Sequence, residues 1–288
     1  MQRCLIIGAS GFIGRNILEI LPKELSLLII TTNPKKIKNI LKNKYNSSSV
    51  IIKNYKFVSP KNKKTFQDLD IIVNAIGAYP KGNNEKILKL LNFSLPKKIF
   101  NLSANNKFKR FININTILRN RKSDYVYYKH KLSDFLKKNK KNTCILDLHV
   151  SHIYGDVKNR REFINYIIRQ IKLKKKFINL TTGNQIRDVI HINDFKEFFL
   201  KLLKINFEKK YNKLEVGSFK SYSIKYLAQK IKKKFNSKIK LNFGALNHKN
   251  GEDFFAMCRK KSLKKISWKP KISLNVGLNI LIRNSKVK

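Results

Sequence analysis

The stretch RCLIIGASGFIGRNILEIL, residues 3–21, decides the fold class of this chain. Its first part is an apolar run typical of a buried strand, and its last part has the apolar spacing of an amphipathic helix. Between them, glycines recur in a G-x-x-G-x-x-G pattern at Gly8, Gly11 and Gly14. Because it stands between a strand and a helix, the motif favours dinucleotide binding over the alternative, an ordinary turn.

A bound pyrophosphate explains the need for glycine in this loop. Glycine permits the tight turn, lets backbone N–H groups approach the phosphates, and allows the helix to pack closely on the strand. The N-terminus of the helix then faces the phosphate charge. We therefore expect cofactor contacts from Gly8, Ser10, Gly11, Phe12, Ile13 and Gly14.

Strand and helix patterns continue to alternate along the chain. Apolar, strand-like runs occupy residues 25–32, 68–77, 108–116 and 142–155, with helical spacing between several of them. This alternation predicts an α/β fold with a Rossmann-type doubly wound parallel sheet in residues 1–155. Residues 156–288 have shorter strands and basic helices. They are expected to form mainly a smaller C-terminal substrate-binding lobe, with some segments returning to the Rossmann sheet.

The end of the second predicted strand bears on the choice of cofactor. NAD-binding folds often carry an acidic residue there, which binds the ribose 2′-hydroxyl. Here the strand ends in TTNPKK, residues 31–36, and no acidic residue lies between Glu24 and Asp68. Thr32, Asn33, Lys35 and Lys36 suit a 2′-phosphate better. We therefore expect NADP(H) to be favoured over NAD(H).

The stretch YVYYKHKLSDFL, residues 125–136, contains the spacing Tyr-x-x-x-Lys twice, as Tyr125 with Lys129 and Tyr127 with Lys131. A tyrosine one helical turn before a lysine can be a catalytic acid, because the ammonium lowers the phenol pKa from about 10. At about 100° per residue, Tyr125 and Lys129 fall toward the apolar face that includes Leu132. The second pair falls on the polar side. The first pair is therefore predicted to face the protein and its cofactor cleft.

The charge of the chain is extreme, with 64 Lys+Arg against 17 Asp+Glu and a net charge of +47. Such a field attracts polyanions, so nucleic acid is a candidate partner. The lysines, however, are spread over every region and have few aromatic residues among them for stacking on bases. This distribution favours a general bias toward lysine over a designed binding surface, and no specific nucleic-acid partner is expected.

Apolar runs, the N-terminal sequence and the cysteines indicate in which cellular compartment the protein is expected. No run of about 18 apolar residues predicts a membrane span, and the N-terminus lacks the features of a signal peptide. Three widely spaced cysteines, Cys4, Cys144 and Cys258, suggest neither a disulfide framework nor a metal site. A cytoplasmic location and no membrane partner are the expectations.

Longer motifs give a specific resemblance. The motifs are distributed over nearly the whole chain: GASGFIG (8–14), VNAIGAY (73–79), FININT (111–116), HIYG (152–155), LTTGNQIRDVIHINDF (180–195) and ISWKPKISLNVGL (266–278). With these motifs the chain resembles the extended short-chain dehydrogenase/reductases, also called the NAD-dependent epimerase/dehydratase family. Within that family it looks most similar to nucleotide-sugar 4-ketoreductases of the CDP-abequose synthase type.

The resemblance implies roles for individual residues. Thr116, Tyr125 and Lys129 match the catalytic Thr, Tyr and Lys, and Asn92 matches an asparagine of the helix that follows the fourth strand. Hydride transfer to C4 of a nucleotide-linked 4-keto-6-deoxy sugar is implied, with Tyr125 as the acid. Further cofactor contacts are expected from Asn33, Asn74, Ala75, Tyr125, Lys129 and His152. Substrate contacts are expected from Tyr79, Thr116 and Arg187. The resemblance leaves a homodimer open.

Two histidines depart from the family pattern. The family often has Asn at the position of His152, next to the nicotinamide, and Arg at the position of His149. Histidine can keep a hydrogen bond but titrates near neutrality. The plain alternative is that each is a hydrogen-bonded residue at a strand end. For Arg187 the plain alternative is an ion pair with Asp188 or Asp194.

Three hypotheses about function remain at this point. The first is a 4-ketoreductase. The second is an epimerase or dehydratase on the same scaffold, although a dehydratase typically adds an acidic pair beside the catalytic Thr, and residues 115–119, NTILR, contain none. The third is an RNA-binding or scaffolding protein without catalysis, which the basic charge favours and the intact Thr–Tyr–Lys set opposes.

Overall fold

The computed structural model describes residues 2–41, 45, 49–79, 84–103, 109–140, 143–155 and 162–286. The chain divides into two compact units. The first comprises residues 1–116, 121–149 and 199–214, and the second comprises residues 117–120, 150–198 and 215–288.

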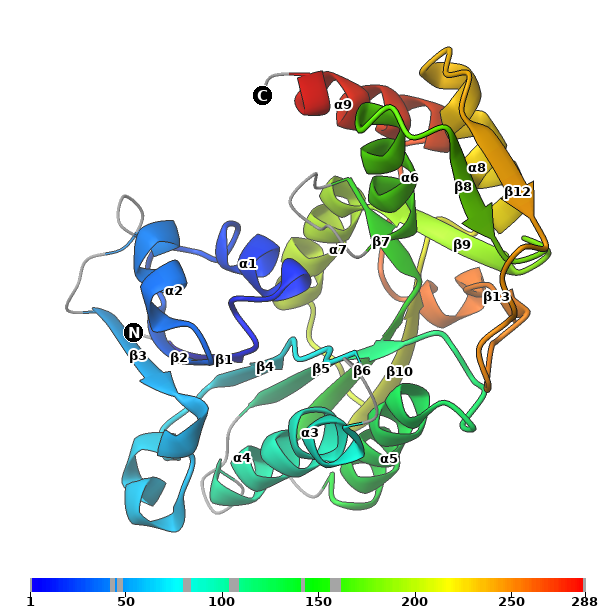
Figure 1. Ribbon diagram of the computed structural model, residues 1–288. Coiled ribbons are helices and arrows are strands. Elements are labelled where there is room, and N and C mark those ends of the chain that lie inside the picture. Colours follow the sequence, from blue (N-terminus) through cyan, green and yellow to red (C-terminus); the bar gives the residue numbers. More distant parts are fainter. Residues whose placement is uncertain are drawn as a thin grey trace. The chain divides into compact units, whose positions relative to one another are not determined.

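A seven-stranded sheet forms the centre of the first unit, with the strand order β10-β6-β5-β4-β1-β2-β3 (Figure 1). The strands are β1 (Arg3–Ile7), β2 (Ser26–Thr31), β3 (Val50–Asn54), β4 (Ile71–Asn74), β5 (Arg110–Thr116), β6 (Cys144–Val150) and β10 (Tyr211–Val216). The pairs from β3 through to β5 are parallel. The order reverses direction between β1 and β4, which is the switch point where doubly wound folds bind their ligands.

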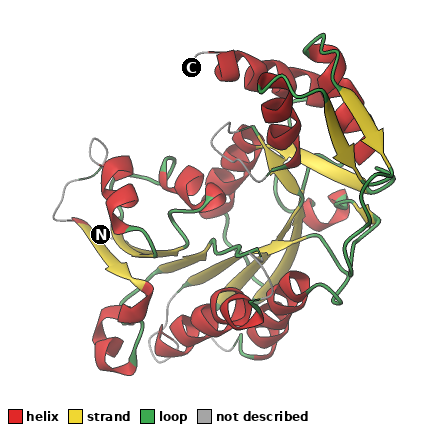
Figure 2. Cartoon of the chain, viewed as in Figure 1, coloured by secondary structure: helices red, strands yellow, loops and turns green. Residues whose placement is uncertain are grey.

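Helices cover both faces of this sheet. In Figure 1, α1 (Phe12–Leu18) and α2 (Pro34–Leu41) lie on one face, and α3 (Glu85–Lys89), α4 (Leu95–Ser103) and α5 (Asp124–Lys138) lie on the other. The same layers are visible in Figure 2, where helices flank the strands on both sides. The predicted α/β fold with a Rossmann-type doubly wound sheet is confirmed.

Burial on both faces explains why the central strands read as continuous apolar runs. The last four residues of β1 and the last five of β2 are buried, as expected of a parallel sheet covered by helices. On one face, Phe111 of β5 packs with Phe100 of α4 and with Leu132 and Leu136 of α5 in a single apolar cluster. This packing fixes α5 against the sheet, and α5 carries the candidate catalytic residues.

Two features of the first unit were not anticipated from sequence. Strand β3 follows a polar stretch, and its burial alternates, so it lacks the apolar run of its neighbours. A π-helical turn at Leu90–Ser94 stands directly before α4. A π-helical turn is rare and frequently marks a functional site.

The second unit contains smaller sheets with helices around them. Strands β11 (Ser221–Ser223), β9 (Ile186–His191) and β13 (Phe255–Ala256) pair in that order, β7 (His152–Tyr154) also pairs with β9, and β12 (Lys240–Phe243) pairs with β8 (Phe177–Leu180). The helices are α6 (Phe163–Lys172), the first half of α7 (Ile192–Lys204), α8 (Ile224–Lys234) and α9 (Leu274–Lys286). Apolar residues of α6, α8 and α9 share one core cluster with strand residues such as Val189.

The strand-like run at residues 142–155 is divided between β6 and a further strand within the motif HIYG. His152, Ile153 and Tyr154 form β7, which pairs in parallel with Val189, Ile190 and His191 of β9. The backbone groups of β7 are therefore used in a sheet. No helix in the described part of the chain combines the length and apolar character that crossing a bilayer requires.

Candidate active site

The glycine loop after β1 is shaped so that only glycine fits at two of its positions. Gly8 has a φ of +81°, and a Cβ there would lie 2.9 Å from the main-chain carbon of Ala75. A Cβ on Gly14 would lie 2.3 Å from the carbonyl oxygen of Gly8. Side chains are excluded at both positions because the loop lies close to the segment after β4 and to the first turn of α1.

A cavity of about 180 Å³ opens beside this loop at the switch point of the sheet. Gly8, Ser10 and Gly11 line one part of it, and residues 75–78, which follow β4, line another. Exposed backbone at a glycine loop and a cleft at the carboxyl ends of β1 and β4 fit the pyrophosphate of a dinucleotide. The residues present therefore suit the cofactor that the loop predicts.

The predicted cofactor contacts divide into two groups. Gly8, Ser10, Gly11 and Ala75 line the cavity, whereas Phe12, Ile13, Gly14, Asn33 and Asn74 do not. Asn74 is fully buried, donates to the Asn113 side chain at 2.8 Å and accepts from the Ile76 N–H at 3.3 Å. Its amide is therefore committed to the protein interior.

The first turn of α2 places a lysine against the glycine loop. Lys36 donates from Nζ to the carbonyl oxygen of Ser10 at 2.9 Å. The side chain of Asn33 accepts from the Lys36 backbone N–H at 3.0 Å, so it caps the start of α2. The position of Lys36 brings a positive charge to the loop without any acidic residue at the end of β2.

Helix α5 has the orientation that its sequence predicts. Tyr125 and Lys129 are buried, with 8% and 2% of their surfaces exposed, whereas Tyr127 is 38% exposed. Lys131 donates to the Tyr127 hydroxyl at 3.3 Å in an exposed position. The helical-face prediction is therefore confirmed: the first Tyr–Lys pair faces the protein, and the second lies at the surface.

Tyr125 lies between a threonine and a second tyrosine. Its hydroxyl hydrogen-bonds with the Thr116 side chain, and its ring stacks on that of Tyr79 with centroids 4.2 Å apart. Burial, and after it the neighbouring Tyr79, raises the pKa of Tyr125 well above 10, although the bond with Thr116 acts in the opposite direction. A lowered phenol pKa was expected from sequence, and this is wrong because burial dominates and Lys129 is not among the groups that act on the phenol.

Lys129 uses its ammonium group to join two strand ends. It donates to the carbonyl oxygen of Ile76 at 2.8 Å and to that of Ile114. Burial lowers the pKa of Lys129 to about 8, against the attraction of Asp147, which raises it. The charge is therefore held at neutral pH but is lost at moderately alkaline pH.

The π-helical turn holds the segment on which Tyr79 lies. Asn92 accepts from the Ala78 N–H at 3.0 Å and donates to the Ala78 carbonyl at 2.9 Å. Only 1% of Asn92 is exposed. This asparagine thus fixes the backbone next to Tyr79, which is itself half-exposed.

Arg187 lies in the second unit and is 5% exposed. Its guanidinium donates to Glu252 at 2.6 Å and to the carbonyl of Ile186 at 3.0 Å. The plain alternative, an ion pair, is correct in kind, but the partner is Glu252 and not Asp188 or Asp194. Asp188 instead accepts from the backbone N–H groups of Ser218 and Phe219 at 2.8 and 3.0 Å.

The two histidines have different environments. His149, in the first unit, lies with Nε2 2.9 Å from a carboxylate oxygen of Asp147, as the hydrogen-bonded alternative predicts. His152, in the second unit, has a buried Nδ1 with no hydrogen-bond partner among the residues that the structure describes. Burial, with a smaller effect of Arg187, lowers the pKa of His152 to about 4. The expectation that it titrates near neutrality is therefore wrong.

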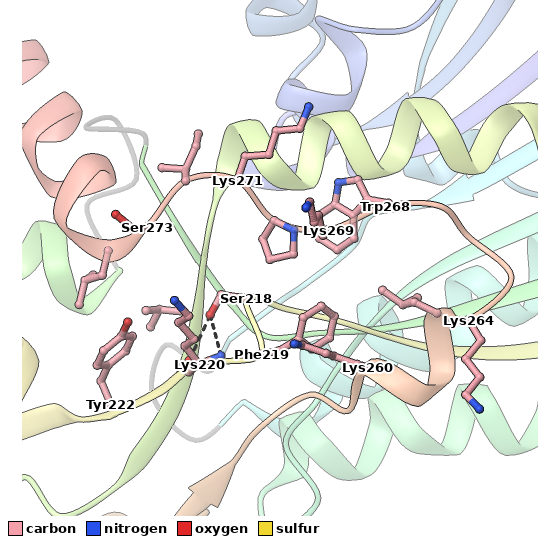
Figure 3. A pocket seen from close by; sticks show the side chains of 15 residues that line it. Ser218, Phe219, Lys220, Tyr222, Lys260, Lys264, Trp268, Lys269, Lys271 and Ser273 are labelled. Atoms are coloured by element: carbon pink, nitrogen blue, oxygen red, sulfur yellow. Dashed lines mark hydrogen bonds between the residues drawn. The ribbon is translucent and has the colours of Figure 1, made fainter.

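A second cavity, of about 350 Å³, lies within the second unit (Figure 3). The labelled side chains around it include Phe219, Tyr222 and Trp268 and five lysines: Lys220, Lys260, Lys264, Lys269 and Lys271. One of these charges is paired, because Lys271 lies 3.0 Å from Glu197. None of the residues predicted from sequence lines this cavity.

Sequence reasoning missed several residues around the site. Tyr128 donates to Glu85 at 2.5 Å, and this carboxylate, followed by burial, raises the pKa of Tyr128 to about 12. Asn113 and Asn115 of β5 hydrogen-bond with buried groups behind the site. The alternation of asparagines in FININT was the available signal, since residues two apart lie on one face of a strand.

Comparisons with known proteins agree with this geometry. Residues 4–217 match the model of the NAD dependent epimerase/dehydratase family. Two curated relatives, the CDP-abequose synthases of Salmonella typhimurium and Salmonella muenchen, are 26% and 25% identical to the chain. The alignments cover 97% and 98% of this chain and 97% of each relative.

Solved structures show the same fold at lower sequence identity. UDP-glucuronic acid 4-epimerase from Bacillus cereus, in complex with UDP-glucuronic acid and NAD, is 20% identical with a TM-score of 0.83, over 99% of both chains. UDP-glucose 4-epimerase from Thermotoga maritima, with UDP-glucose, is 13% identical with a TM-score of 0.82, also over 99% of both chains.

Proposed function

Because this chain belongs to the NAD dependent epimerase/dehydratase family, we propose that it reduces C4 of a nucleotide-linked 4-keto-6-deoxy sugar by hydride transfer. Membership confirms the family resemblance and makes the chain an NAD-dependent enzyme. The reductase assignment within the family rests on the relation to the CDP-abequose synthases, whose name specifies a nucleotide-linked sugar.

The observation that carries the proposal is the buried Tyr125 phenol beside the Thr116 hydroxyl. The bound nicotinamide cofactor supplies the hydride. Tyr125 donates its proton to the oxygen on C4 as the carbon–oxygen double bond becomes a single bond. Thr116 donates a hydrogen bond that orients this oxygen. The raised pKa of Tyr125 supports the acid role, since the phenol keeps its proton at neutral pH.

Lys129 contributes position and charge. Its bonds to the carbonyls of Ile76 and Ile114 connect the ends of β4 and β5 to α5. We propose that the ammonium also binds the nicotinamide ribose. Tyr79, which stacks on Tyr125 and is half-exposed, is the proposed contact for the sugar ring.

The cofactor is proposed to be NADP(H) in preference to NAD(H). Lys36 at the glycine loop supports this, because a 2′-phosphate carries a negative charge and an acidic residue for the free 2′-hydroxyl is missing after β2. For the substrate, the proposed contact to the diphosphate is Arg187. It would exchange its partner Glu252 for phosphate oxygens, which guanidinium groups bind in the same fork geometry.

An epimerase on the same residues is the alternative. Both activities use the Thr–Tyr–Lys set, but a reductase consumes one reduced cofactor per turnover and an epimerase has no net consumption. A non-catalytic, RNA-binding protein would need neither the Tyr125–Thr116 bond nor the glycine loop.

The test is a turnover assay with CDP-, dTDP-, UDP- and GDP-linked 4-keto-6-deoxy sugars and with NADPH and NADH. A reductase oxidises the cofactor in proportion to the amount of 4-keto sugar added. Interconversion of the C4 epimers of the corresponding nucleotide-linked 4-hydroxy sugars, assayed in parallel and without net oxidation of added cofactor, would replace the proposal by the epimerase. No reaction with any sugar, together with absent cofactor binding, would refute both.

A further inference from the structure

A carboxylate without any exposed surface lies behind the candidate active site. Asp147 of β6 is 0% exposed, yet its neighbours on the strand, Leu146 and Leu148, are apolar and equally buried. A buried carboxylate is costly unless its oxygens are fully hydrogen-bonded. Its partners therefore show what the residue holds in place.

Four side chains supply the short hydrogen bonds to Asp147. One oxygen, Oδ1, accepts from Asn113 at 2.7 Å. The other, Oδ2, accepts from Ser133 at 2.5 Å and from Tyr211 at 2.8 Å, and lies 2.9 Å from Nε2 of His149. Burial alone would raise the pKa of Asp147, but bonds from His149, Ser133 and Tyr211 hold the pKa well below its usual range. The carboxylate of Asp147 is therefore ionised, and it accepts hydrogen bonds from the side chains that surround it.

These partners belong to the elements that carry the candidate catalytic residues. Ser133 lies one helical turn after Lys129 on α5 and also accepts from Asn115 at 2.5 Å. Asn115 directly precedes Thr116, and its side-chain oxygen accepts from the Thr116 N–H at 2.8 Å. The network thus joins α5 to the end of β5 through Asp147 and Ser133.

We infer that Asp147 is a positioning residue for the reaction: through Ser133 and the two asparagines of β5 it sets the distance between α5, with Tyr125 and Lys129, and Thr116. This inference rests on the proposed function for its effect on turnover. The hydrogen-bond network around Asp147 consists only of side chains of the first unit.

Asp147 also acts on Lys129 through its charge. It is the group whose attraction raises the pKa of Lys129 against burial. The other titratable groups around the carboxylate are His149 on β6 and Tyr211 on β10, and the ring of His130 on α5 lies 5.3 Å from that of His149. Loss of the Asp147 charge removes the attraction that opposes the effect of burial on the Lys129 pKa, so the ammonium gives up its proton at lower pH.

The test compares Asp147→Asn with Ser133→Ala and with the control Asp134→Asn. Asn is close in shape to Asp, but it has lost the charge and one acceptor oxygen. Ser133→Ala keeps the charge and removes the link to α5. Asp134 is an acid on the same helix that pairs at the surface with Arg121, 3.0 Å away. Its substitution repeats the chemical change without removing a hydrogen bond of the network, although its charge acts weakly on Tyr211.

Turnover and its pH profile give the first readout. We expect kcat of Asp147→Asn and Ser133→Ala to fall by about 10- to 100-fold, because small misplacements of reacting groups have effects of this size. KM for the cofactor should change by less than about threefold, since the glycine loop is not part of the network. Only Asp147→Asn should move the alkaline limb of the profile to lower pH, and Asp134→Asn should match the wild type.

A second readout requires no substrate and separates this inference from the proposed function. The stability difference between each background and its Lys129→Met variant is measured by chemical denaturation from about pH 6 to pH 10. The pH at which this difference has changed by half reports the pKa of Lys129. This midpoint pH should be lower in Asp147→Asn than in the wild type, and it should be unchanged in Ser133→Ala. If Asp147→Asn leaves both kcat and this midpoint unchanged, the inference is refuted. If the wild type has no turnover but the midpoint moves, only the proposed function fails.

If Asp147→Asn does not fold, Ser133→Ala carries the test alone. A tenfold or greater loss of kcat with an unchanged pH profile and intact cofactor binding supports positioning through α5. Turnover equal to that of Asp134→Asn overturns it.

Discussion

The ammonium of Lys129 donates a 2.8 Å hydrogen bond to the main-chain carbonyl of Ile76, two residues beyond the end of β4. The bond connects the helix that carries Tyr125 to the segment that lines the cofactor cavity. It also explains why a charged group can be 2% exposed, since charge-assisted bonds to carbonyls compensate part of the lost hydration.

The first prediction concerns the titration of this lysine. Burial lowers the pKa of Lys129 from 10.5 to about 8, so the unfolded chain binds more protons than the folded protein between those values. The contribution of Lys129 to the free energy of unfolding therefore rises with pH across that window, by on the order of 3 kcal/mol, and is constant below it. Lys129→Met should lack this rise. Denaturant titrations of both proteins at pH 7 and pH 10 check the sign, and parallel pH dependences would contradict it.

The second prediction uses the two Tyr–Lys pairs as matched variants. Tyr125→Phe should lower kcat by about 10²- to 10⁴-fold, because it removes the proposed general acid. The loss of its bond with Thr116 should leave cofactor affinity within a few fold. Tyr127→Phe, at a residue that is 38% exposed, should be near neutral. Equal losses in the two variants would show that the chemistry does not depend on the buried phenol.

The third prediction addresses cofactor choice. NADPH should bind more tightly than NADH, and Lys36→Glu should reverse the order, because it places a negative charge beside the expected 2′-phosphate. Lys38→Glu on the same helix is the matched control for the change in net charge. Fluorescence titrations of the three proteins with both cofactors decide the question. A clear preference of the wild type for NADH would remove the basis for the NADP(H) proposal.

The fourth prediction concerns the glycine loop. In Gly14→Ala the new Cβ would lie 2.3 Å from the Gly8 carbonyl, and the obstacle is backbone that cannot rotate away. We expect a loss of about 1–3 kcal/mol in stability, the usual range for overpacking, and weaker cofactor binding as α1 moves away from the loop. Denaturation and fluorescence titration measure the two effects. An alanine variant with wild-type affinity would show that the close approach is not needed.

Periodicity predicted the parts of the fold and site that depend on local spacing. The 3.6-residue repeat of the helix predicted that Tyr125 is buried and Tyr127 is exposed, because the apolar residues of the helix define the face that packs against the protein. The glycine loop was predictable for a similar reason. At Gly14 the close approach is to the Gly8 carbonyl and so lies within seven residues, whereas the approach of Gly8 to Ala75 depends on the fold.

Contacts between distant parts of the chain were not predictable. Arg187 pairs with Glu252, 65 residues away, although two acidic residues lie closer in sequence. Asp147 joins Asn113, Ser133 and Tyr211 from three different elements. The pKa of Tyr125 was predicted in the wrong direction, because its value depends on tertiary burial more than on the lysine one turn away.

The last prediction separates a cofactor-binding enzyme from a nucleic-acid binder. With a net charge of +47, the chain will bind RNA at low salt whatever its function, because each phosphate contact releases counterions. If the lysines have no common target, this attraction should weaken steeply at physiological ionic strength, where the Debye length is about 8 Å. RNA affinity should then fall to the non-specific range, a Kd of about 10⁻⁴–10⁻⁶ M. NADPH should remain bound, because the glycine loop adds directed backbone hydrogen bonds to the charge attraction. Parallel salt titrations of RNA and NADPH binding measure both. Nanomolar, sequence-selective RNA binding at physiological salt, without cofactor binding, would overturn the enzyme in favour of a nucleic-acid function.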